Sequence, residues 1–116
     1  MSVIFLETRQ DFDSLLQNNR YVAVVFSAVW CGPCKAVSPI FEAHAKEKSP
    51  QISFAKIDVD IVPEVAAQYK VASIPTFLLI KDGQVVDRVP NSALKALKVA
   101  IERFVDLIGV QELEHK

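Results

Sequence analysis

Residues 29–35 read Val29-Trp30-Cys31-Gly32-Pro33-Cys34-Lys35, and they hold both cysteines of the 116-residue chain. An apolar run, Tyr21–Ser27, comes before this stretch, and residues with helical periodicity follow it. This context predicts the end of a buried strand, a tight turn and the start of a helix. The two cysteines therefore fall where the strand meets the helix.

The start of a helix favours an ionised sulfur. Its first turn has unpaired N–H groups and a partial positive charge, which stabilise an anion such as a thiolate. Pro33 fits that turn because its missing N–H costs nothing there. We expect an exposed, reactive Cys31 at or just before the helix start and a sheltered Cys34 inside the first turn. Reversible thiol–disulfide exchange needs such a pair.

Two other uses of a Cys-x-x-Cys pair have weaker support. A zinc site needs four ligands, and neither His44 nor His115 lies at the spacing of a known zinc finger. His44 falls on the buried stripe of the predicted helix, where we expect it to have a packing role. A structural disulfide across two residues would close a very short loop and add little stability. We therefore interpret the pair as redox-active and expect no metal.

Further motifs identify a resemblance. Residues Trp30–Lys35 match the active-site motif of the thioredoxin family residue for residue. Three later stretches follow in the family order: Phe54-Ala55-Lys56-Ile57-Asp58-Val59-Asp60, Ile74-Pro75-Thr76-Phe77-Leu78 and Lys81-Asp82-Gly83. The resemblance covers residues 3–108 and implies an α/β protein with the thioredoxin fold, a central mixed five-stranded sheet flanked by four helices.

The composition is that of a single globular domain. Apolar residues make up 51% of the chain, enough for one core. The 13 basic and 14 acidic residues form no basic stripe, which argues against a nucleic-acid partner. No run approaches the ~20 apolar residues of a membrane span, and the first residues lack the pattern of a signal peptide. Two cysteines without an export signal favour a reducing compartment, by default the cytoplasm.

Periodicity and turn signals predict the other elements. Strands are expected at residues 2–5, 21–27, 52–59, 76–81 and 84–88, and helices after Thr8, at residues 33–48 and 63–69, and after Ser92. The strand at 21–27 should be central because it is apolar on both faces. Asp82-Gly83 predicts a two-residue hairpin turn. We place a single domain at residues 1–110 and expect a frayed tail at 111–116.

The resemblance implies roles for individual residues. Cys31 would be the nucleophile and Cys34 the resolving thiol, supported by Trp30, Gly32, Pro33, Lys35, Lys56 and Pro75, with an apolar substrate groove formed by Val59, Ile74 and Val89. Trp30 could instead belong to the core, because large aromatic side chains are usually buried. Base rates favour a trans Ile74–Pro75 bond, whereas the matching proline of the family is cis. The apolar groove suits loosely ordered protein substrates.

Three positions depart from the family pattern. Val25 stands where the family commonly has a buried aspartate, which takes the proton of the resolving thiol. Lys56, the matching partner of that acid, must then reach water or lose its proton readily. Ser27 replaces a tryptophan, and Pro90-Asn91 stands where a glycine is usual, which predicts a narrower groove. We expect slower resolution of the mixed disulfide or fewer substrates, with exchange retained.

The resemblance implies a protein-disulfide reductase that carries electrons on a reversible Cys31–Cys34 disulfide. The chain has no Gly-x-Gly-x-x-Gly motif for a nicotinamide or flavin, so we expect no bound cofactor and a separate, NADPH-linked thioredoxin reductase. The expected partners are this reductase and proteins with disulfides, without a nucleic acid or membrane. The alternative is a scaffold module, as in the larger monothiol glutaredoxins. Those domains often lose a motif cysteine, and this chain keeps both.

Overall fold

The computed structural model describes residues 2–90 and 94–114. Within these residues the chain forms one mixed five-stranded sheet, in the order β1-β3-β2-β4-β5, and four helices. The elements are β1 (Val3–Leu6), α1 (Arg9–Asn18), β2 (Tyr21–Ser27), α2 (Gly32–Lys48), β3 (Ser53–Asp58), α3 (Pro63–Gln68), β4 (Thr76–Lys81), β5 (Gln84–Pro90) and α4 (Leu94–Glu114). The predicted fold class and architecture are confirmed.

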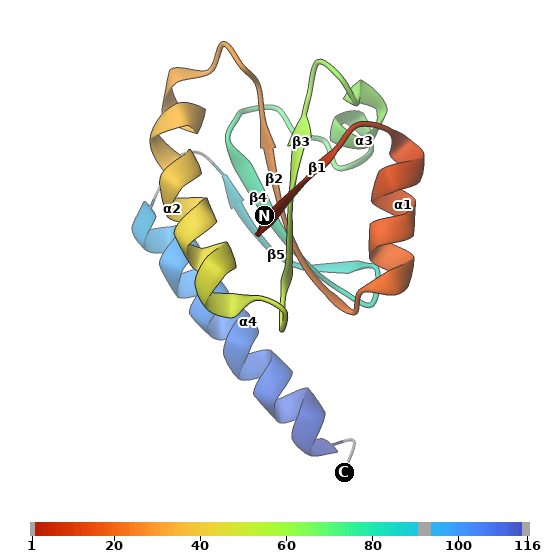
Figure 1. Cartoon of the computed structure of the whole chain (residues 1–116), viewed down its shortest axis with the longest axis vertical. Coiled ribbons are helices and arrows are strands. Elements are labelled where there is room, and N and C mark those ends of the chain that lie inside the picture. Colours follow the sequence, from red (N-terminus) through yellow and green to blue (C-terminus); the bar gives the residue numbers. More distant parts are fainter. Residues whose placement is uncertain (1, 91–93, 115–116) are drawn as a thin grey trace.

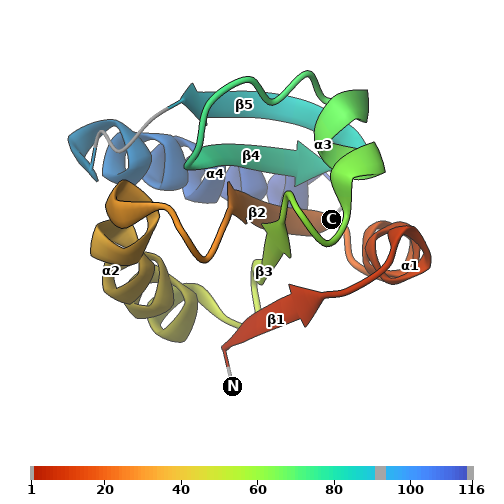
Figure 2. The same ribbon diagram turned by 90° about the horizontal axis from the view of Figure 1, so that it is seen from above.

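Helices cover both faces of the sheet. Helices α2 and α4 lie on one face and α1 and α3 on the other (Figure 1), and the view from above separates the same three layers (Figure 2). Each face has its own core: Phe41, Phe77 and Phe104 lie in the α2/α4 cluster, and Phe12 and Phe26 in the α1/α3 cluster. Burying each of these rings contributes roughly 1.5–3 kcal/mol.

Strand β2 is the centre of the sheet, as its composition predicts. All seven of its residues are buried, and it pairs in parallel with β3 and antiparallel with β4. Successive side chains alternate between the faces, so Val25 joins the α2/α4 cluster and Phe26 the α1/α3 cluster. The strand ends at Ser27, so the cysteine stretch lies at the C-terminal end of this central strand, where α2 begins.

Two local signals act as predicted. Thr8 caps α1, because its Oγ1 accepts a hydrogen bond of 3.0 Å from the N–H of Asp11. Asp82 and Gly83 connect β4 to β5 with φ values of 50° and 79°, the positive angles that a two-residue hairpin turn requires. The helix start and the hairpin are therefore encoded by the residues that form them.

Helix α4 continues through most of the predicted tail. It ends at Glu114, whereas we expected residues 111–116 to be frayed. Its inner side stays anchored: Ile108 is buried, and Lys81 Nζ donates a hydrogen bond of 2.9 Å to the side-chain oxygen of Gln111. The predicted cap Ser92 and residues 115–116 lie outside the described residues. In the described ranges no helix, α4 included, is long and apolar enough to cross a membrane.

His44 on α2 gives the fold a pH dependence. Burial lowers the pKa of this half-buried imidazole below its ordinary value of 6.5, with smaller and opposing effects from Glu47, Lys48, Lys98 and Glu102. The unfolded chain therefore binds the proton at a higher pH than the folded chain does. By linkage, the free energy of unfolding falls as the pH drops below about 6.5.

Urea denaturation at about pH 7.5 and about pH 5.5 measures this effect. The wild type is expected to lose more stability at the lower pH than His44→Gln, because glutamine does not titrate. Carboxylates titrate in both proteins and cancel in the comparison. Equal losses in the two proteins would show that His44 makes no contribution.

Candidate active site

Cys31 and Cys34 meet at the N-terminus of α2. Cys31 is the N-cap and Cys34 lies in the first turn, their Cα atoms are 5.2 Å apart, and their sulfurs form a disulfide. The N–H of Cys34 donates to Cys31 Sγ at 3.1 Å. Pro33 lies in the first turn, and open space surrounds Gly32 where a side chain would project. Lys35 is exposed, and its N–H donates to the carbonyl oxygen of Cys31 at 3.3 Å.

The two cysteines do not differ in exposure, which corrects one prediction. Each is 4% exposed in this disulfide form. Cys31 and Cys34 pack with Ala28, Val59 and Ile74, and Cys31 Sγ lies 3.9 Å from the carbonyl oxygen of Ile74. The prediction of an exposed Cys31 is wrong for this disulfide form, because Val59 and Ile74, which are distant in the sequence, pack against it.

Two of the three predicted groove residues lie at the disulfide. Ile74 and Val59 pack against the cysteine pair, and the Val59 N–H donates to the carbonyl oxygen of Ser27 at 2.9 Å. The Ile74–Pro75 bond is cis, as the resemblance implies, and Pro75 is buried. Val89, the third, is buried in the α2/α4 cluster instead. The structure therefore does not bring Val89 into the cluster around the cysteines.

Trp30 lies on the surface next to the cysteine pair, so the core alternative is wrong. Its side chain is 67% exposed, and its Nε1–H donates to Asp60 Oδ2 at 2.8 Å. The N–H of Asp60 in turn donates to Asp58 Oδ1 at 2.8 Å, which holds the loop in place. Asp60 belongs to a stretch that matches the family, but the sequence alone does not predict its contact with Trp30. Exposed Val29 and Ile61 extend the apolar surface.

A row of residues across the sheet explains the environment of Lys56. The strand register aligns Phe5, Lys56, Val25, Phe77 and Val89, one from each strand. The Nζ of half-buried Lys56 lies 5.6 Å from the ring centroid of Phe5. No carboxylate among residues 2–90 and 94–114 forms an ion pair with it.

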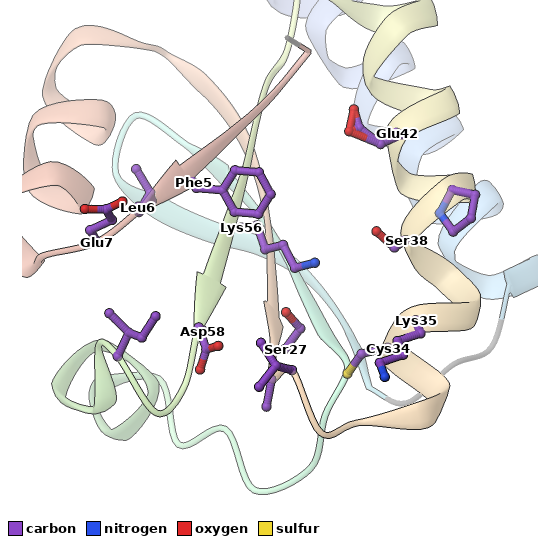
Figure 3. Close-up of a pocket in the computed structure, with 14 residues that line it drawn as sticks. Phe5, Leu6, Glu7, Ser27, Cys34, Lys35, Ser38, Glu42, Lys56 and Asp58 are labelled. Carbon is purple, nitrogen blue, oxygen red and sulfur yellow. The ribbon is translucent and has the colours of Figure 1, made fainter.

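A cleft of about 890 Å³ lies behind Cys34 (Figure 3). Its walls come from β1, α2 and the ends of β2 and β3, and the Lys56 ammonium and the Cys34 sulfur are directed into it. The size is typical of small-molecule sites. Ser27, which stands where the family has a tryptophan, is part of the lining of this cleft, which the sequence does not predict. In the described part of the chain no group of three or more His, Cys, Asp or Glu side chains could hold a metal ion.

Comparison with known proteins agrees with this geometry. The family model for thioredoxin matches residues 3–103. Thioredoxin-2 of Pyricularia oryzae is 47% identical over 101 residues, which cover 87% of this chain but 58% of that protein. The bifunctional thioredoxin reductase/thioredoxin of Mycobacterium leprae is 46% identical over 85 residues, 73% of this chain and 19% of that protein. The solved thioredoxin of Plasmodium falciparum superposes with a TM-score of 0.83 at 38% identity, covering 86% of this chain and 97% of that one.

The matched region contains all five described strands and the start of α2 with both cysteines. The fold, the sequence and the cysteine pair of this chain therefore all match those of thioredoxins over most of its length. The chain belongs to the thioredoxin family of thiol-disulfide oxidoreductases and carries the cysteine pair of that family.

Proposed function

We propose that this chain reduces disulfide bonds in proteins, with Cys31 as the nucleophile and Cys34 as the resolving thiol. The observation that carries the proposal is the position of Cys31 at the N-cap of α2, where its sulfur accepts the N–H of Cys34 at 3.1 Å. That donor and the helix dipole both favour a negative charge on the Cys31 sulfur. Cys31 is therefore the sulfur best prepared to attack.

The reaction proceeds by two exchanges. The Cys31 thiolate attacks one sulfur of a target disulfide, forms a mixed disulfide and expels the other target sulfur as a thiolate. Cys34 then loses its proton, attacks Cys31 Sγ and expels the second target sulfur. Two electrons have passed to the target, and the chain is left with the Cys31–Cys34 disulfide that the structure holds.

The surroundings of Cys31 suit an extended protein segment. Trp30, Val59 and Ile74 supply apolar surface beside the sulfur, and the backbone carbonyl oxygen of Ile74 lies 3.9 Å from it. A target strand would pair with this backbone while its disulfide reaches Cys31. Gly32 and Lys35 support the start of the helix, and Val89 contributes through core packing.

We propose a thioredoxin reductase, linked to NADPH, as the electron donor and disulfide-containing proteins as the acceptors. The name of the Mycobacterium leprae relative joins a thioredoxin reductase to a thioredoxin, which supports the choice of donor. A reducing compartment such as the cytoplasm is the proposed location, because the pair works only where it is returned to the dithiol form.

Reduction of insulin disulfides, followed as turbidity, tests the proposal. With dithiothreitol as the electron source, the chain is expected to accelerate the reaction by at least about tenfold, which is about 1.4 kcal/mol of barrier. Replacing dithiothreitol by thioredoxin reductase and NADPH should sustain the reaction. A rate equal to that of dithiothreitol alone would overturn the proposal and favour the scaffold alternative.

A further inference from the structure

The resolving step needs a group that takes the proton of Cys34. The thiolate, and not the thiol, is the attacking form. Val25 on β2 faces the α2/α4 cluster and is 4% exposed, and its side chain cannot accept a proton. The proton must therefore leave Cys34 in another direction.

A small cavity connects Val25 and Cys34 with polar groups. Its volume is about 30 Å³, enough for a water molecule. Its polar lining consists of Ser27, Cys34, Ser38, Glu42 and Lys56. The same five residues also line the 890 Å³ cleft. The cavity and the cleft therefore share a polar wall, which provides a route from the Cys34 sulfur to solvent.

Three of these residues lie along one face of α2. Cys34, Ser38 and Glu42 are spaced by four residues, so their side chains follow one another along the helix, as Figure 3 shows. Glu42 begins about 12 Å from Cys34 along the axis. Glu42 and Ser38 lie one turn apart on this face, and both line the small cavity together with Cys34. The Ser38 hydroxyl and a water molecule in this cavity are the groups that can relay a proton between Cys34 and Glu42.

The charges around the cavity single out Glu42. Lys56 lines the cavity from β3, so an ammonium group lies in the same lining as Cys34 and Glu42. Lys35, Glu7 and Asp58 line the outer cleft but not the cavity. Among the described residues Glu42 is thus the one carboxylate in the cavity lining.

We propose that Glu42 accepts the proton of Cys34, through the Ser38 hydroxyl and a water molecule in the small cavity, when Cys34 resolves the mixed disulfide. The inference rests on the proposed function and deepens it. The Cys34 S–H bond breaks, and its proton passes to Glu42 and then through the cleft to solvent. The Cys34 sulfur forms the bond to Cys31, and the target sulfur leaves with the electron pair of the broken bond.

Dithiobis(nitrobenzoate), a chromogenic disulfide, separates the two steps. With reduced protein in excess, attack by Cys31 releases one coloured thiolate and resolution by Cys34 releases the second. In stopped-flow measurements, Glu42→Gln is expected to leave the first phase unchanged. Near neutral pH it should slow the second by about tenfold or more, since general bases contribute about 10²–10⁴-fold at full strength. The difference should shrink at alkaline pH, where hydroxide deprotonates the thiol.

Matched variants identify the cause of any slowing. Glu47→Gln removes the same charge from an exposed position on α2, where Glu47 pairs with Lys48 at 2.9 Å, and should change neither phase. Acetate, which can enter the cleft, is expected to restore the second phase of Glu42→Gln, and Glu42→Asp should retain part of it. A second phase as fast as in the wild type, or slowed equally by Glu47→Gln, would overturn the inference. A missing first phase in the wild type would instead overturn the proposed function.

Discussion

Cys34→Ser is expected to stop turnover and to hold a target protein on Cys31 as a stable mixed disulfide. A serine hydroxyl is not ionised near neutral pH and cannot displace the target sulfur, so only the second exchange is lost. The first is retained because the 3.1 Å donor to Cys31 Sγ is the backbone N–H of residue 34, which the substitution keeps. Turnover should fall by at least about a thousandfold, or about 4 kcal/mol of barrier.

Electrophoresis without reductant, before and after addition of dithiothreitol, detects the trapped complex. Cys31→Ser is the matched control and should give neither turnover nor a complex, since the nucleophile is gone. Neither substitution should unfold the chain, because a disulfide across so short a loop adds little stability. A complex with Cys31→Ser and none with Cys34→Ser would reverse the roles of the two cysteines.

The strand, turn and helix around the cysteines could be predicted because each part depends on its own residues. Residues 21–26 are all apolar, so both faces of the strand are apolar, and only a strand covered on both sides buries them. Helix α2 begins at Gly32, one residue before the predicted start, with Cys31 as its N-cap and Pro33 in its first turn. The hairpin at Asp82-Gly83 likewise needs no information from elsewhere in the chain.

The features that could not be predicted depend on segments that are distant in the sequence. Cys31 is buried because Val59 and Ile74 reach it from other parts of the chain. The register that puts Phe5 under Lys56 is set by pairing between β1 and β3. The cis bond before Pro75 is predicted only by the family resemblance, since X–Pro bonds in folded proteins are usually trans.

The cleft at the active site could not be predicted either, because segments distant in the sequence form its walls. In the sequence, Val25 and Ser27 are two separate departures from the family pattern. In the structure both line one small cavity with Cys34, together with Glu42 from a later turn of α2. The eight-residue spacing that places Cys34 and Glu42 on one face of α2 can be read from the sequence. Which groups that face contacts depends on the strands packed opposite the helix.

Val25→Asp is expected to speed resolution and to lower stability. The new carboxyl group would enter the α2/α4 cluster beside Lys56, its register partner on β3. Burying it costs roughly 1–3 kcal/mol, and attraction to the Lys56 ammonium offsets part of that cost. It would also lie on the wall of the cavity that Cys34 and Glu42 line, as a second proton acceptor for the thiol. The second phase of the chromogenic assay should therefore accelerate near neutral pH.

Val25→Asn separates the two effects, because the amide has a similar shape and polarity but does not take up a proton. It should lose stability in urea denaturation without any gain in rate. If an acid at position 25 supplies a second proton route, Glu42→Gln should lose most of its effect in the Val25→Asp background, since coupled sites are not additive. An unchanged second phase in Val25→Asp would show that the proton acceptor does not limit resolution in this chain.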